Sequence, residues 1–116
     1  MSKLLSILAI ILSMSQTAVA ADRVVSCKIT TGKTQVYNGP CLFMPEPGGS
    51  FSLSNTNRQG PLFDDVGVLS VFIITKGTAE VRGLTSSGNN SRWGEAKRSS
   101  KDRACWEGAD FSICAR

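Results

Sequence analysis

Four cysteines in a short chain limit most strongly what this sequence can fold into. Cys27, Cys41, Cys105 and Cys114 all follow an N-terminal apolar stretch, and the 116 residues contain no other cysteine. An even number of cysteines in a small exported domain is typical of a disulfide framework. Three pairings are open, and we favour Cys27–Cys41 and Cys105–Cys114 because each pair brackets a stretch with hairpin turn residues. A zinc site is the alternative, but the chain has no histidine and no C-x-x-C pair.

The first residues have the pattern of a bacterial signal peptide. Lys3 supplies a positive charge, Leu4–Leu12 is apolar, and Ala18-Val19-Ala20 has the small residues that precede cleavage. The apolar run is about half of the ~20 residues that a membrane-spanning helix needs, although a retained N-terminal anchor is the alternative. We therefore expect a signal peptide over 1–20, cleaved after Ala20 or Ala21, and a periplasmic or secreted protein. Residues 21–116 are then expected to form a single β-rich domain.

Strand patterns dominate the rest of the chain. Val66–Thr75 is long and β-branched enough for a central strand buried on both faces. Lys76-Gly77 predicts a tight turn into Thr78–Thr85, which places Ala79, Val81 and Gly83 on one face. Ser50–Ser54 alternates apolar and polar residues, as a half-buried strand does. The other expected strands are Val24–Thr30, Thr34–Tyr37, Cys41–Met44, Ala104–Glu107 and Asp110–Ala115.

Two stretches are expected to lack strand pairing. Asn38-Gly39-Pro40 should break the ladder because proline has no N–H to donate. Arg92–Arg103 should hold one weak helical turn near Gly94–Ser99, or an ordered loop pinned by Trp93. About seven or eight short strands predict an all-β fold, either a small antiparallel barrel or a sandwich, braced by the two disulfides.

Most of the excess positive charge lies in Arg92–Arg103. Removing Lys3 from the 13 Lys+Arg leaves 12 against 9 Asp+Glu, and this segment has five positive and two negative residues. A solvated face is one interpretation. The other is a site for an anionic partner such as a cell-wall polymer, lipopolysaccharide or an acidic protein. The charge is too small to indicate a nucleic-acid binder. The candidate binding residues are Arg92, Trp93, Lys97, Arg98, Lys101 and Arg103.

The two tryptophans permit two interpretations. Trp93 lies among basic residues, a combination that is frequent at recognition surfaces, but a tryptophan in a small domain is also an obvious core residue. We leave both interpretations open for Trp93. For Trp106 and Phe111, beside the expected C-terminal disulfide, we predict core positions.

The absence of histidine excludes several kinds of catalysis. Ser-His-Asp and Cys-His activation both need it, and paired cysteines cannot act as thiol nucleophiles. Carboxylate chemistry remains open, although a glycosidase needs two carboxyls about 5–10 Å apart across a cleft. We expect no catalytic residue, no metal and no cofactor. The carboxylates concerned are Asp64, Asp65, Glu80, Glu95, Glu107 and Asp110.

Three short blocks carry a resemblance to a known group of proteins. They are C-x-I-x(2)-G with V-Y-x-G-P-C over Cys27–Cys41, G-G-S-F-S-L over Gly48–Leu53, and A-C-W with I-C-A over Ala104–Ala115. With these blocks the chain resembles small exported proteobacterial proteins of unknown function. The resemblance fits local disulfides and implies no ligand or catalytic residue. In size, export signal and disulfides the chain is also similar to periplasmic lysozyme inhibitors, but it lacks their short loop motifs.

Together these features favour a non-catalytic exported binding protein of the bacterial envelope, with an inhibitor of a cell-wall hydrolase or of a host enzyme as the most concrete version. One alternative is an accessory or structural envelope protein that self-associates through an exposed strand edge. Another is a small carboxylate-dependent hydrolase.

Overall fold

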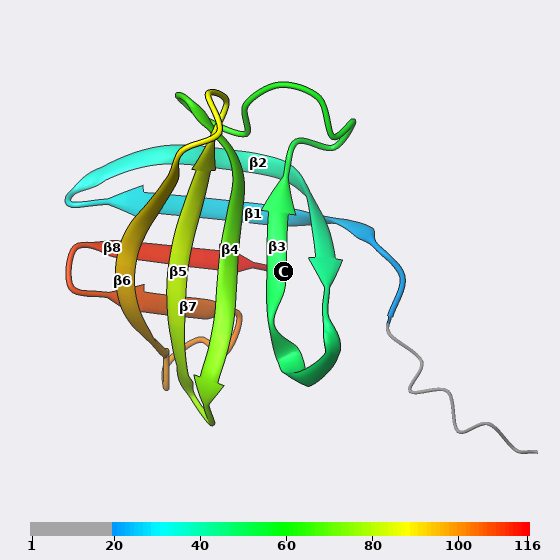
Figure 1. Ribbon diagram of the computed structural model, residues 1–116. Helices are drawn as coiled ribbons and strands as arrows, with labels where there is room; N and C mark the ends of the chain where they lie inside the picture. The colour runs from blue at the N-terminus through cyan, green and yellow to red at the C-terminus, as the bar shows by residue number, and fades with distance from the viewer. Residues whose placement is uncertain (1–19) are drawn as a thin grey trace, which may run out of the picture.

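Eight antiparallel strands close into a barrel in which each strand pairs with its neighbours in the sequence (Figure 1). The computed structural model describes residues 20–116, so the expected signal peptide, apart from Ala20, lies outside the described residues. The strands are β1 (Arg23–Thr31), β2 (Thr34–Pro45), β3 (Phe51–Ser54), β4 (Val66–Thr75), β5 (Thr78–Thr85), β6 (Asn90–Arg98), β7 (Cys105–Gly108) and β8 (Phe111–Ala115). A 3-10 turn, η1 (Pro47–Gly49), connects β2 to β3. The prediction of a small antiparallel β fold is confirmed, in its barrel form.

Pairing between the first and last strands closes the barrel. In the β1–β8 ladder Cys27 lies opposite Ala115 and Thr31 opposite Phe111. Figure 1 shows β1, β7 and β8 running across β3–β6, with the long β2 passing from one group to the other. Among residues 20–116 no helix is long and apolar enough to cross a membrane.

Inward-facing side chains fill the barrel. An eight-stranded barrel has an interior just wide enough for side chains, and here aliphatic residues from both groups of strands meet in it. Ala79 and Val81 of β5 face inward with Gly83, as expected from their alternation. The largest fully buried side chains include Ile29, Leu53, Leu69, Ile113, Val71 and Val81.

The strand β4 is buried on one face only, so the prediction of burial on both faces is wrong. Leu69 and Val71 are fully buried, but Phe72 is 40% exposed and Ile74 is 58% exposed. A barrel wall has a single packed face, because its outer surface meets solvent unless another element covers it. The apolar run of β4 thus leaves two large side chains outside the barrel.

The strand β2 runs through Pro40, so the predicted break at Asn38-Gly39-Pro40 is also wrong. Pro40 lies opposite Ser26, whose backbone N–H and C=O both bond to Arg116 on the other side of β1. Antiparallel residues direct both polar groups to one side, so Ser26 has no bond to offer β2 at this position. On its other side, β2 pairs with β3 only from Leu42 onward. The missing N–H of Pro40 is therefore not needed by either ladder.

Both preferred disulfides are present, and they occupy different places. Cys27–Cys41 joins β1 to β2 inside the barrel, where both residues are fully buried. Cys105–Cys114 joins directly opposed positions of β7 and β8, beside the pair Trp106 and Ile113. Because neighbouring residues in a strand point to opposite faces, this second bridge lies outside the wall that Trp106 and Ile113 line from within.

The connections between strands alternate between the two ends of the barrel, since each strand is antiparallel to the one before. We call one end the basic end. It comprises the connections 46–50, 76–77 and 99–104, together with Arg23 at the start of β1, Arg98 at the end of β6 and Arg116 after β8. Its charged residues have a net charge of +4: Arg23, Glu46, Lys76, Arg98, Lys101, Asp102, Arg103 and Arg116. The connections at the opposite end have a net charge of −1, from Lys33, Arg58, Asp64, Asp65 and Asp110.

Candidate binding surface

The segment Arg92–Arg103 is a strand followed by a loop, and no helical turn forms in it. Residues up to Arg98 belong to β6, which pairs with β5 and β7. Sequence reasoning missed this strand because a glycine, a serine and several charges conceal its inward positions. The side chains of this segment therefore lie in three places: on the outer wall, in the interior and at the basic end.

Two of the six candidate binding residues lie on the outer wall. The guanidinium of Arg92 forms an ion pair with Glu80 at 2.9 Å, and Arg82 joins the same carboxylate at 3.1 Å. Lys97 donates to the hydroxyl of Thr78 at 3.0 Å and lies 3.4 Å from Glu95. Each of these two cations thus has an acidic partner within the wall.

Trp93 faces the interior near the opposite end. A bulge in the β5–β6 ladder inserts Trp93 between Arg92 and Gly94, and Gly94 has the positive φ of 117°. A bulge re-aims side chains, and here it turns the indole inward while Arg92 points outward. The Trp93 ring packs edge-on against Phe63 at 5.9 Å and Phe111 at 5.6 Å between centroids. Trp93 thus packs against the core while it stays partly exposed, and it lines a hollow of about 260 Å³ together with Arg92 and Asp110.

Gly83 provides the space that Trp93 occupies. A Cβ at Gly83 would lie 3.0 Å from the indole nitrogen of Trp93. That separation is too short for a carbon–nitrogen contact, so any larger residue at this position of β5 would displace the ring. The smallest inward-facing residue of β5, Gly83, therefore lies beside the large indole of Trp93 on β6.

Arg98 covers the other tryptophan, at the basic end. Trp106 is 2% exposed, which confirms it as a core residue, and the guanidinium carbon of Arg98 lies 5.0 Å from the centre of its ring. The N–H of Arg98 donates to the carbonyl of Gly77 at 2.9 Å, which fixes the backbone beneath this side chain. The basic residue that sequence reasoning grouped with Trp93 thus stacks on Trp106 instead.

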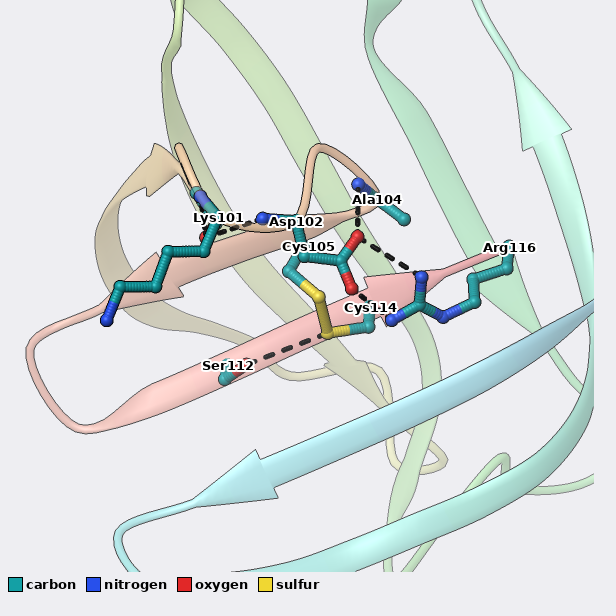
Figure 2. A network of polar contacts seen from close by, with 8 residues as sticks. Lys101, Asp102, Ala104, Cys105, Ser112, Cys114 and Arg116 are labelled. Atoms are coloured by element: carbon teal, nitrogen blue, oxygen red, sulfur yellow. Dashed lines mark hydrogen bonds and ion pairs between the residues drawn. A yellow bond between two sulfur atoms is a disulfide. The ribbon is translucent and has the colours of Figure 1, made fainter.

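Lys101 and Arg103 lie in the loop between β6 and β7, which a network of polar contacts orders (Figure 2). The buried hydroxyl of Ser99 accepts from the N–H groups of Lys101 and Asp102, at 3.2 Å each. Asp102 accepts from the N–H of Ala104 at 3.1 Å and forms an ion pair with Arg116. In Figure 2 the side chain of Lys101 extends away from this ion pair. The loop thus presents its cation outward from a defined backbone.

The same contacts act on the charge of Asp102. The hydrogen bond from Arg116 lowers the pKa of this carboxyl below its usual value, and the bond from the N–H of Ala104 acts in the same direction. Both contacts favour the ionised carboxylate. The ionised carboxylate of Asp102 therefore holds the loop, and it stays ionised to a lower pH than the carboxylate of an ordinary aspartate does.

Arg23 belongs to the basic end although it precedes the predicted segment by 69 residues. Its guanidinium carbon lies 4.6 Å from the centre of the Phe43 ring, which stacks on Phe51 at 4.8 Å. Arg23, Arg98 and Arg103 line one depression of about 190 Å³. Nothing in the sequence indicates this meeting, since it depends on the pairing of β1 with both β2 and β8.

A second and larger hollow adjoins this depression. The groove has a volume of about 510 Å³, and it shares Gly49, Arg98 and Trp106 with the depression. Ile73, Ile74 and Trp106 are the large apolar residues that line it. A further hollow of about 430 Å³ is lined by Lys76, Arg98 and Arg103 together. The basic end thus combines four cations with an apolar groove.

The chemistry available here is that of binding charged groups. Arginine forks donate to carboxylate or phosphate oxygens, and a ring beneath the guanidinium limits the positions it can take. Among the described residues no three cysteine or carboxylate side chains are grouped as metal ligands would be. Comparison with known proteins gives no match: no family model matches the chain, and no curated protein or solved structure is significantly similar.

Proposed function

We propose that this chain is a non-catalytic, exported binding protein of the bacterial envelope that holds an anionic partner at its basic end. The observation that carries the proposal is the meeting of Arg23, Arg98 and Arg103 at one depression, with Lys76 beside it. Among residues 20–116 none of these four has an ion pair. Unpaired cations in one place attract and orient an anionic partner.

The export part of the proposal is supported by the disulfides. Two bridges in a small domain fit an oxidising compartment, and the N-terminal residues have the pattern of a signal peptide. The periplasm or the medium is therefore the compartment in which we would look for the partner.

The non-catalytic part is supported by how the carboxylates are used. Glu80, Glu95 and Asp102 all form ion pairs with basic side chains. Asp64 and Asp65 belong to the connection between β3 and β4, at the end away from the arginines. A carboxylate-dependent hydrolase needs two carboxyls that face a common substrate. The hollows of the basic end have no carboxylate in their lining, whereas Glu107 and Asp110 line one hollow of about 270 Å³ at the opposite end, which is where that alternative would be tested.

The alternative of self-association through a strand edge finds less support. Every strand among the described residues has a neighbour on both sides, because β1 pairs with β8. Barrel closure therefore shortens the rows of unpaired backbone groups to which a second copy would add, although β2 pairs with β3 only over Leu42–Pro45 and β6 pairs with β7 only over Ala96–Arg98.

A pull-down tests the proposal. The protein is secreted with its own N-terminal residues, purified in oxidised form, and exposed to soluble periplasmic extract, peptidoglycan and envelope lipids. We expect a partner that is lost at raised salt, because screening shortens the range of exposed charges from about 10 Å at 0.1 M to about 3 Å at 1 M. The same partner should be lost with the double variant Arg98→Glu/Lys101→Glu.

The matched control is Lys28→Glu/Lys33→Glu. It changes the net charge by the same amount but places the change on β1 and on the connection at the opposite end. Equal loss in both variants, or no partner in any fraction, contradicts the proposal. If the captured partner is a cell-wall hydrolase or a host enzyme, inhibition of its activity by the wild type and not by the Arg98→Glu/Lys101→Glu variant would identify an inhibitor.

A further inference from the structure

We propose that the anionic partner is a phosphorylated amphiphile, whose phosphate lies in the depression lined by Arg23, Arg98 and Arg103 and whose acyl chain lies along the adjoining groove. The inference rests on the proposed function and narrows it to one class of ligand. It is drawn from the arrangement of cationic and apolar groups at the basic end.

The three arginines form a site that fits a phosphate group. They come from the start of β1, the end of β6 and the β6–β7 loop, and they share a depression of about 190 Å³ with no carboxylate in its lining. Arg23 lies over Phe43 and Arg98 over Trp106, so two of the three guanidiniums are held by aromatic rings. Planar forks that converge from different directions match the several oxygens of a phosphate better than a single carboxylate.

The adjoining groove offers a place for an apolar chain. It holds about 510 Å³, and its wall includes Ile73 and Ile74, of which Ile74 is 58% exposed. Gly48 and Gly49, both with positive φ, form its other side without side chains. A Cβ at Gly49 would lie 3.7 Å from Ile73, so a larger residue there would narrow the groove. Burial of such exposed apolar surface is a driving force for binding a hydrocarbon.

The junction of these two sites favours a lipid over an acidic protein. Arg98 and Trp106 line both hollows, so a ligand that fills both must place its anionic group directly next to its apolar part. Protein interfaces derive most of their affinity from exposed aromatic and arginine anchors, whereas the Trp106 ring here is buried beneath a guanidinium. Basic residues beside exposed apolar ones are typical of surfaces that bind anionic lipids.

The experiment compares three soluble probes by isothermal titration and by NMR shift changes. They are dihexanoyl phosphatidic acid below its micelle concentration, glycerol 3-phosphate and hexanoate. We expect the acylated phosphate to bind at least about tenfold more tightly than glycerol 3-phosphate, because each buried methylene adds affinity. Hexanoate should bind most weakly of the three. Equal affinity for the two phosphates, or for the acylated phosphate and hexanoate, overturns the proposal.

Two variants separate the contribution of the phosphate contact from that of the acyl-chain contact. Both variants change exposed side chains, so the fold is retained. Arg103→Gln should weaken both phosphate probes by about tenfold, the effect of one charge-assisted contact. Ile74→Ser should weaken only the acylated probe. The controls are Lys28→Gln, a cation remote from the depression, and Leu84→Ser, an apolar side chain 44% exposed on β5. Effects of the controls as large as those of the variants overturn the proposal.

Vesicles of phosphatidylcholine with and without phosphatidic acid identify the source of the lipid. Binding to the anionic vesicles as well as to the monomer supports the inference and indicates a membrane surface, and binding to the monomer alone supports it and indicates a free lipid. Vesicle binding that Ile74→Ser leaves unchanged overturns the placement of the acyl chain. If no lipid probe binds but the pull-down retains a salt-sensitive acidic protein, the proposed function stands and this inference fails.

Discussion

The two ends of the barrel are both closed by aromatic side chains, but different groups cover them. At the opposite end Trp93 meets Phe63 and Phe111 edge to face. At the basic end the rings of Trp106 and Phe43 lie beneath arginines. Aromatic pairs add packing energy to the burial of their area, whereas an arginine on a ring also keeps a charge at the surface. The first arrangement serves stability, and the second leaves cations available to a partner.

The largest expected effect concerns the ring beneath Arg98. Replacing the buried Trp106 by alanine should lower the free energy of unfolding by about 3–5 kcal/mol, because it removes a large core side chain and leaves a cavity. Chemical denaturation measures this loss. Arg98→Ala should change the same quantity by no more than about 1 kcal/mol, since the guanidinium is exposed. A larger loss for Arg98→Ala than for Trp106→Ala would mean that the arginine, and not the ring, closes the basic end.

An intermediate effect is expected at the opposite end. A Cβ at Gly108 of β7 would overlap the Phe111 ring, which packs against Trp93. Gly108→Ala should therefore destabilise the protein by about 1–3 kcal/mol through overpacking.

The matched control for this variant is Gly67→Ala. A Cβ at Gly67 would lie 3.6 Å from the carbonyl oxygen of Leu84, which is an ordinary van der Waals contact. We expect no loss of stability there, because alanine reduces the entropy of the unfolded chain. If thermal unfolding gives the two variants the same midpoint, the aromatic group at the opposite end does not need the space beside Gly108.

The smallest expected effect is a dependence on pH at the basic end. Folding lowers the pKa of Asp102, so this carboxyl stabilises the folded protein above its usual pKa of 3.8. The contribution is lost as the pH falls through the lowered value, where the folded form also takes up the proton. The wild type should therefore be slightly more stable than Asp102→Asn at neutral pH, and the difference should vanish in acid. Urea titrations across this range measure it, and a difference that persists or grows in acid contradicts the assignment.

Much of the fold could be predicted from local patterns. The Lys76-Gly77 hairpin, the inward row of Ala79 and Val81, and the opposition of Cys105 to Cys114 are all present. Each of these three features depends on residues that are close in sequence, because the type of turn sets how two strands pair and the alternation of side chains sets which residues face inward. The strand β6 was missed, and β2 was divided in two at Pro40, because both depend on which neighbours the strands have in the closed barrel.

The candidate site could be predicted only in part. Arg98 and Arg103 were found from their place in a basic segment, whereas Arg23 carried no such signal and the sequence left both interpretations of Trp93 open. The bulge at Gly94 turns Trp93 inward, and such a bulge is visible only when β5 lies beside β6. Arg92 and Lys97 belong to the same basic segment but lie on the outer face of the wall, since side chains along a strand alternate between its two faces.

The sequence by itself determined the all-β class and the absence of histidine chemistry, and it favoured the local disulfides among three open pairings, because composition and short-range spacing bear on these properties. Only the tertiary structure decided that the strands close into a barrel, that the apolar β4 keeps one face outside, and that arginines from three parts of the chain meet over aromatic rings. These features depend on contacts between residues far apart in the sequence. The register of pairing and the closure of the barrel set such contacts, and no local pattern encodes either of them.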